Sequence, residues 1–284
     1  MNRFGGDWTK IKIEILVEYA KAYLTIMNSR SFFKLLYFDG FAGSGEIIKE
    51  KNNEEKSTIN LDITIGAARR IIEINTPRPF DEYYFVEKNP KNYRLLESKT
   101  KKAFPLKKIF TTQEDCNKKL IDLANYLRVP ANSRYRTLAY IDPCGMQVEW
   151  RSIECLRGLP IDMWILVPTG LGVNRLLKKD GQISDTWLAK LELFLRLSRD
   201  EIESYFYKKE NTLFAEIIDV RKEVGAIKKS AELYRSRLKE VFQHVSTPFE
   251  LKNSSNSIMF HLFLTSNNKA ALKIANDIVA KYNS

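Results

Sequence analysis

Hydrophobic residues near the N-terminus recur with helical spacing. Between residues 8 and 27, apolar side chains recur three or four positions apart, which predicts one long amphipathic helix. A short, mostly apolar run at 34–39 then predicts a buried strand that ends at Asp39. A glycine-rich turn follows it directly, and the polar stretch 49–59 predicts a surface loop.

The strand-then-helix pattern repeats further along the chain. Short apolar runs predict strands at 83–86, 107–112, 136–141 and 162–167. Amphipathic stretches between and around them predict helices near 63–75 and at 90–101, 116–128 and 150–158. Strands that alternate with helices form a parallel sheet with right-handed crossovers. The sequence therefore predicts an α/β fold.

The C-terminal part has a different pattern. Residues 171–245 predict mainly helices, for example at 188–197 and 231–242, and we interpret them as an insertion. Two apolar runs around a polar turn at 252–256 predict a β-hairpin, and a helix at 268–282 closes the chain. The expected organisation is an N-terminal helical segment, a core, a helical insertion, and a hairpin and helix that complete the core: 1–30, 31–170, 171–245 and 246–284.

Composition narrows the class of protein. A hydrophobic content of 44% can fill a core, and no uncharged apolar run reaches the roughly 18 residues of a membrane span. The N-terminus has no apolar signal segment, so we expect a cytoplasmic protein. Two histidines and three scattered cysteines, Cys116, Cys144 and Cys155, indicate neither a zinc site nor a disulfide framework.

The formal net charge of +11 indicates a basic surface, and this surface has two possible interpretations. The densest basic run lies between residues 99 and 108 and includes Lys101, Lys102, Lys107 and Lys108. Such a run is either a solvated face or a surface that contacts a polyanion, most simply nucleic acid.

Acidic residues stand at the ends of four predicted strands: Asp39, Glu87, Asp115 and Asp142. The carboxyl ends of parallel strands meet at one edge of a sheet, where open α/β folds bind ligands. Three of the 12 glycines, Gly40, Gly43 and Gly45, follow the first acid within six positions. Glycine lets backbone approach a ligand closely, although a tight turn without a ligand also uses it.

Further candidates follow the last two strands. Cys144 is either a nucleophile or an inert buried thiol. Glu149 and Trp150 suit a general base and a ring that stacks on a substrate base, or simply the start of a helix. Asn174 and Arg175, after a glycine pair, suit substrate phosphate, closure of a pocket, or a helix cap.

Several segments together resemble a known family. The stretch "DGFAGSG" resembles motif I of class I S-adenosylmethionine (SAM) dependent methyltransferases. More narrowly, "WTKIKIEILVEYAKAYLTIM", "FVEKNP", "IDPCGMQVEW" and "DMWILVPTGLGVNRLL" are similar to the three-Cys-motif partner proteins, abbreviated TcmP. The similarity runs from about residue 8 to 177 and returns at "FHLFLTSNNKAALKI". It implies a Rossmann-like class I methyltransferase fold and a separate partner protein with three cysteines, but no particular substrate.

The resemblance also implies roles for the strand-end residues. The turn with Gly40, Phe41, Gly43 and Gly45 would surround the methionine part of SAM, and Asp39 would hold its ammonium group. Glu87 would accept both ribose hydroxyls. Asp115, or Gln113 or Glu114 beside it, would accept the adenine amino group, unless Asp115 serves only as a helix N-cap.

Asp142 and Pro143 are the candidate reactive site. Enzymes that methylate amino groups of nucleic acids grip the amine with an acid-Pro-Pro-aromatic stretch, and here Cys144 and Gly145 replace its second half. We expect a SAM-dependent methyltransferase of nucleic acid or a nucleotide-derived substrate, with direct transfer and no metal. The alternatives are a non-catalytic subunit of the three-cysteine partner, a methyltransferase of a protein or small molecule, and a metal-dependent nuclease.

Overall fold

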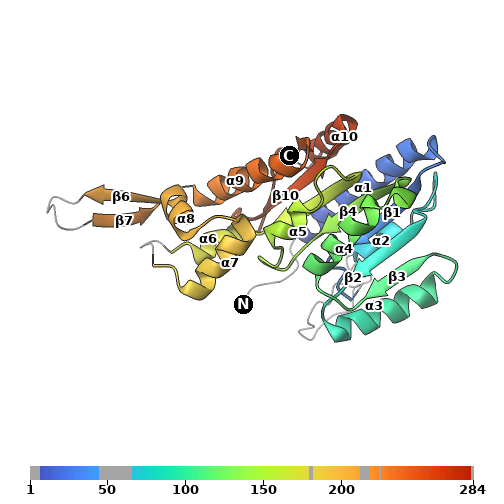
Figure 1. The fold of residues 1–284 in the computed structure, drawn as a ribbon, viewed down its shortest axis with the longest axis horizontal. Helices are drawn as coiled ribbons and strands as arrows, with labels where there is room; N and C mark the ends of the chain where they lie inside the picture. The colour runs from blue at the N-terminus through green and yellow to red at the C-terminus, as the bar shows by residue number, and fades with distance from the viewer. Residues whose placement is uncertain (1–6, 45–65, 179–181, 212–217, 224, 283–284) are drawn as a thin grey trace.

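A single mixed sheet with helices on both faces forms the body of the molecule (Figure 1). The computed structural model describes residues 7–44, 66–178, 182–211, 218–223 and 225–282. The first half of the chain forms these elements: α1 (Asp7–Asn28), β1 (Lys34–Asp39), α2 (Ala67–Ile72), β2 (Glu82–Val86), α3 (Pro90–Ala103), β3 (Ile109–Thr112), α4 (Cys116–Arg128), η3 (Pro130–Asn132), β4 (Tyr135–Ile141), α5 (Trp150–Glu154) and β5 (Ile161–Val167).

The second half adds short helices, a small hairpin and the antiparallel end of the sheet. Its elements are η4 (Thr169–Val173), α6 (Asn174–Leu176), α7 (Asp185–Leu195), α8 (Arg199–Phe206), β6 (Tyr207–Asn211), β7 (Ile218–Lys222), α9 (Ala226–Val241), β8 (His244–Val245), β9 (Phe249–Lys252), β10 (Ile258–Ser266) and α10 (Lys269–Ala280).

The strand order of the main sheet confirms the predicted fold class. The described strands follow the order β3-β2-β1-β4-β5-β10-β8, and β9 also pairs with β10. The first five strands are parallel, whereas β10 is antiparallel to β5, β8 and β9. The chain moves outward in opposite directions on the two sides of β1, and open α/β sheets bind ligands at the carboxyl ends of the strands at such a switch point, here β1 and β4.

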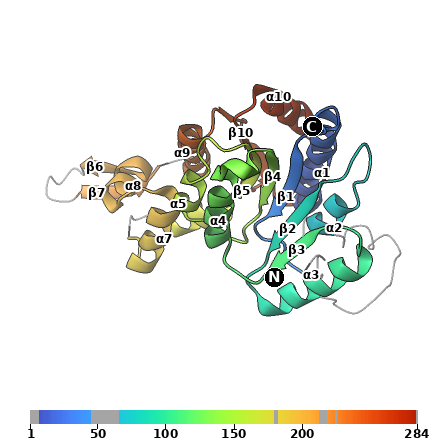
Figure 2. The same ribbon diagram turned by 45° about the vertical axis from the view of Figure 1, so that its right-hand side comes forward.

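Each face of the sheet buries its own hydrophobic cluster. Helices α1, α2 and α10 cover one face, and α4, α5 and α9 cover the other (Figure 2). Helix α1 forms because its apolar positions repeat with helical spacing, and its Leu16, Tyr19 and Tyr23 are buried against the sheet. The predicted helices and strands of the core all occur, with shifts of a few residues at their ends.

The region 171–245 is mainly helical, as the sequence predicts, and it also contains strands that the sequence did not indicate. Strands β6 and β7 form an antiparallel hairpin that extends away from the sheet (Figure 1). β6 has a single apolar residue, Tyr207, and β7 alternates over only four positions, 218–221, so the pattern of apolar and polar positions gives little signal for either strand. Helices α7 and α9 share a core with the main sheet, because Phe194 and Tyr234 belong to the same buried cluster as β4 and β5.

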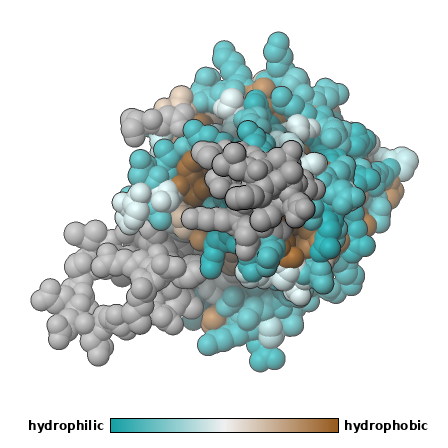
Figure 3. Space-filling view, turned by 90° about the vertical axis from the view of Figure 1, so that its left-hand side faces the viewer, coloured by the Kyte–Doolittle hydropathy of each residue, from teal (hydrophilic) through white to brown (hydrophobic). Residues whose placement is uncertain are grey.

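Seen from the end that carries this hairpin, the described surface is mainly hydrophilic, with small apolar patches (Figure 3). None of the described helices has the length and apolar character needed to cross a membrane.

Candidate functional site

The acidic strand ends meet at one edge of the sheet, as the sequence predicts. Asp39 is in register with Phe85 of β2 and Tyr140 of β4, so the three strands end side by side. The Glu87 N–H donates to the Thr112 carbonyl and continues this edge to β3. The turn after β1 is held between its neighbours, because Gly40 N donates to Tyr140 O and Ala42 N donates to Val86 O.

Asp39 is a buried carboxyl group with unusual electrostatics. Its Oδ1 accepts from the Phe41 N–H at 3.1 Å, and its Oδ2 accepts from the Tyr37 hydroxyl at 3.4 Å. Burial raises the pKa of Asp39 to about 7, with the Phe41 N–H lowering it and the charges of Asp142 and Glu87 raising it. No lysine, arginine or histidine pairs with it in the described residues. A cationic ligand group is what would compensate this carboxylate.

Asp142 has a cationic partner that sequence reasoning missed. Lys12 of α1 donates to both of its carboxylate oxygens, at 2.8 and 2.6 Å, and the Tyr140 hydroxyl adds a bond of 3.0 Å. The side chains of Lys12 and Asp142 are only 9% and 19% exposed. Lys12 also lies 5.0 Å from the ring of Trp8. Lys12 lies on the apolar face of the predicted helix. This position is the feature of the sequence that could have indicated an acidic partner, because a charge on a buried face needs one.

Glu87 and Asp115 lie at the same edge and make local hydrogen bonds. Glu87 Oε1 accepts from the Asn89 N–H at 2.7 Å. Asp115 caps α4 through Asn117 N at 2.9 Å and pairs with Lys88 at 3.0 Å. Burial favours a higher pKa for Asp115, but the bonds from Lys88 and Asn117 outweigh it and leave the pKa below its usual value. Asp115 is therefore the N-cap of α4, and its carboxylate also lies at the edge of the sheet where β1 and β2 end.

The glycines of the turn have different structural reasons. A Cβ on Gly40 would lie 2.5 Å from Cys116 Sγ and 2.8 Å from Ile141 Cδ1, so Gly40 is required by packing. Gly43 has a φ of +63°, so the backbone conformation favours glycine there, and apart from its chain neighbours no described residue lies within 4 Å of the place where a Cβ would stand. Phe41 is half-buried. The predicted Gly45 lies outside the described residues.

The segment after β4 is exposed at Cys144. The interpretation of Cys144 as an inert buried thiol is therefore wrong about its burial, although Pro143 beside it is buried. The Cys144 N–H donates to Gln147 Oε1 at 3.0 Å. Partial desolvation and the negative charge of Asp142 raise the pKa of the thiol, which disfavours the thiolate that a nucleophile requires.

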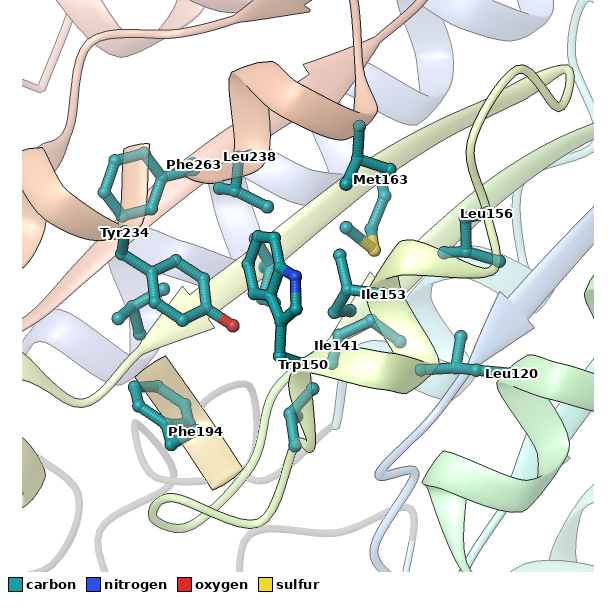
Figure 4. Packing of buried hydrophobic residues seen from close by; sticks show 14 of the residues in the cluster. Leu120, Ile141, Trp150, Ile153, Leu156, Met163, Phe194, Tyr234, Leu238 and Phe263 are labelled. Carbon is teal, nitrogen blue, oxygen red and sulfur yellow. The ribbon is translucent and has the colours of Figure 1, made fainter. Parts of the chain in front are cut away.

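Trp150 does not face the site, and its prediction as a stacking platform is wrong. Its side chain is 2% exposed and meets the Tyr234 ring edge-on, with centroids 5.7 Å apart. Figure 4 shows it enclosed by core residues of β5, α5, α7 and α9. Glu149, the candidate general base, bonds to Arg151 Nε at 2.6 Å. No substrate group is needed to explain either residue.

Asn117 is a second residue that sequence reasoning missed. Its Oδ1 accepts from Glu149 N at 2.8 Å and from Ser152 Oγ at 2.9 Å, and its Nδ2 donates to Gln147 O at 2.8 Å. One buried amide therefore joins the start of α4 to the loop after β4. Nothing in the sequence distinguishes this asparagine from other polar residues at a helix start.

Asn174 and Arg175 start α6 after the π-helical turn η4. The Asn174 carbonyl accepts from Lys222 Nζ at 2.7 Å, and the Arg175 side chain is exposed. The turn before them closes against the loop after β4, because a Cβ on Gly172 would lie 3.0 Å from Met146 Cγ. The two predicted loops are thus neighbours, but no contact links Arg175 to Asp39 or Asp142 in the described residues.

The basic run lies at the opposite edge of the sheet. Helix α3 starts after the carboxyl end of β2 and runs back, so Lys101 and Lys102 at its last turn lie near the amino end of β3, as does Lys108. Lys101 pairs with Glu97. Lys107 does not belong to a free basic face, because it bonds to Ile72 O and to Asn75 Oδ1, and desolvation lowers its pKa.

Neither a family model nor a curated protein matches this sequence. Among solved structures, protein LPL1258 of Legionella pneumophila, of family DUF519, gives a TM-score of 0.49 at 19% identity, over 98% of this chain and 93% of that chain. Trm1 of Pyrococcus horikoshii, solved with S-adenosyl-L-methionine, gives 0.46 at 12% identity over 94% of this chain, which spans 57% of the Trm1 chain. These similarities give no residue a role.

The strand order and the edge with Asp39, Glu87 and Asp142 define the class of the protein. It is an α/β protein with a class I methyltransferase-like fold. The narrower resemblance to the TcmP family has no matching family model and stays an expectation.

Proposed function

We propose that the protein is a SAM-dependent methyltransferase of the TcmP family that transfers a methyl group directly to nucleic acid or a nucleotide-derived substrate. The observation that carries this proposal is the buried Asp39 carboxyl group, which has no cation beside it in the described residues. It stands at the end of β1, where a glycine turn follows and, apart from the chain neighbours, none of the described residues comes within 4 Å of the Cβ position of Gly43.

The residues of this edge fit the cofactor. SAM, when bound, supplies an electrophilic methyl group and also carries an ammonium group, a ribose diol and an adenine. Asp39 would hold the ammonium group, and the turn 40–43 would lie against the methionine part. Glu87 has one carboxylate oxygen without a partner in the described residues, which could accept from the ribose. Asp115 stands where an adenine amino group could be accepted.

Asp142 would orient the substrate. Lys12 and Tyr140 hold its carboxylate in one position, so a target group that reaches this edge meets an acceptor at a defined place. The buried Pro143 makes the backbone after it stiff. The Glu149 carboxylate is bonded to Arg151, so we assign substrate positioning to Asp142. Proton removal by Glu149 is a separate hypothesis.

Nucleic acid is proposed as the substrate class because of the net charge of +11. Lys101 and Lys102 of α3 and Lys108 before β3 would contact it only if it extended around the molecule, because they lie at the far edge. One observation favours a second candidate, a non-catalytic subunit of a three-cysteine partner protein. Both oxygens of Asp142 are already bonded to Lys12, which leaves less capacity to bind a target amine.

Transfer of labelled methyl from SAM separates these candidates. RNA, DNA and protein from a cell extract are offered to the wild type and to Asp39→Asn, with and without a candidate partner. We expect label in a nucleic-acid fraction with the wild type and none with the variant. SAM binding without label in any fraction would favour the non-catalytic subunit.

A further inference from the structure

An apolar groove lies on the face of the sheet beside α4, away from the acidic edge. Its volume is about 350 Å³, within the size range of small-molecule sites. Strands β1, β2 and β3 supply its floor, and Leu123 and Tyr126 of α4 supply its wall. The floor residues 36, 38, 82, 84 and 110 precede the strand ends that form the candidate cofactor site. The groove is therefore a separate place on the molecule.

A row of three stacked rings crosses the floor. Phe38 is in register with Tyr84, and Tyr84 is in register with Phe110. The first two ring centroids are 5.8 Å apart with planes 7° apart, and the next two are 6.4 Å apart with planes 30° apart. Phe110 is 50% exposed and belongs to β3, the edge strand. The stack thus ends on a ring that another planar ring could extend.

Polar groups surround this apolar floor. Glu82 accepts from the Tyr135 hydroxyl at 3.2 Å, and Lys119 and Asp122, three positions apart on α4, pair at 2.9 Å along the wall of the groove. Carboxylate acceptors and an ammonium donor are the groups that read the edge of a nucleobase. A purely apolar peptide side chain would use none of them.

Two further cations lie on the same face. Side chains alternate along a strand, so Lys34 shares the face of Leu36 and Phe38, and Lys108 shares the face of Phe110. Lys34 Nζ lies 5.5 Å from the ring of Tyr135. Neither lysine has a carboxylate partner in the part of the chain that the structure describes. Unpaired cations beside stacked rings form the usual site for single-stranded nucleic acid.

We propose that this groove binds a nucleobase, which stacks on the exposed ring of Phe110 at the end of the Phe38–Tyr84–Phe110 row while Lys34 and Lys108 contact its phosphates. The base belongs to a free nucleotide or to an unpaired position in a strand, and the chemistry of recognition is the same for both. This site does not depend on methyl transfer or on SAM.

The test is fluorescence titration of the full chain with adenosine monophosphate and with a ten-nucleotide single-stranded oligoadenylate. Phe110→Ala should weaken binding about tenfold, because stacking contributes roughly 1–3 kcal/mol per base. Phe32→Ala is the matched control, because Phe32 is an exposed aromatic residue outside the groove. The double variant Lys34→Gln/Lys108→Gln should weaken the oligonucleotide and flatten its salt dependence.

The two ligands distinguish the two sources of the base. Groove-dependent binding of the monophosphate alone would indicate a nucleotide, and that of the oligonucleotide alone would indicate a nucleic-acid strand. No binding of either would overturn the proposal, as would equal losses in Phe110→Ala and Phe32→Ala. Binding lost in Asp39→Asn but kept in Phe110→Ala would also overturn it, because the ligand would then occupy the cofactor edge.

Discussion

The carboxyl group of Asp39 links pH to stability at the residue scale. Its pKa in the folded protein is about 7, above the ordinary 3.8, so between these values the folded state holds more protons than the unfolded chain. Its contribution to stability is therefore greatest below about pH 4 and falls as pH rises towards 7, by up to about 1.4 kcal/mol per pH unit.

We predict that Asp39→Asn removes this dependence. The free energy of unfolding of the variant, relative to the wild type, should rise between pH 4 and pH 8 in urea titrations. The comparison within one pair cancels the other titrating groups. A difference that stays constant across this range would mean that Asp39 is not the buried acid described here.

Lys12 and Asp142 form a pair that should couple strongly. Lys12→Met leaves the Asp142 carboxylate without its cation in a largely buried place, so we expect a loss of about 3 kcal/mol in the free energy of unfolding. Lys12→Met/Asp142→Asn should recover most of that loss. Additive losses in this double-mutant cycle would show that the pair contributes nothing as a pair.

The two glycines of the turn should respond differently to alanine. Gly40→Ala should cost about 1–3 kcal/mol through overpacking against Cys116 and Ile141, and Cys116→Ala in the same chain should relieve part of it. Gly43→Ala should cost about 1 kcal/mol through its positive φ, with no relief from Cys116→Ala. Thermal unfolding of the four variants would show whether the two mechanisms differ in this way.

At the scale of elements, α5 depends on Trp150. We predict that Trp150→Ala costs about 3–5 kcal/mol, because the indole fills the space between α5, α7 and α9. Trp150→Phe should cost clearly less. The SAM affinity of Trp150→Phe should equal that of the wild type. If Trp150 instead stacked on the substrate, its substitution would lower activity and leave stability unchanged.

Periodicity revealed the elements because most of them are buried on one defined face. The apolar run at 34–39 fits a buried strand, and the helical spacing at 8–27 fits an amphipathic helix; the structure has both. The β6–β7 hairpin extends from the body and gives little such pattern, because β6 has one apolar residue and β7 alternates over only four positions. The loop after β4 was harder still, since burial of Trp150 depends on α9, more than 70 residues later in the chain.

At the scale of the whole molecule, the sheet explains how much of the site was predictable. Strand ends indicated Asp39, Glu87, Asp115 and Asp142, because parallel order alone brings them to one edge. Lys12 and Asn117 reach that edge from helices, and which helix packs where is a tertiary property. The same sheet places Lys101, Lys102 and Lys108 at its opposite edge, so the run that looked like a substrate surface is remote from the acids.

The most direct test of the central claim is calorimetric titration of the purified protein with SAM, repeated on Asp39→Asn. We predict micromolar binding by the wild type that strengthens as pH rises from 5 towards 7, because the ammonium group needs the ionised Asp39. The variant should bind at least tenfold more weakly. Equal affinity in the two proteins, or no binding by the wild type with or without a candidate three-cysteine protein, would contradict the account.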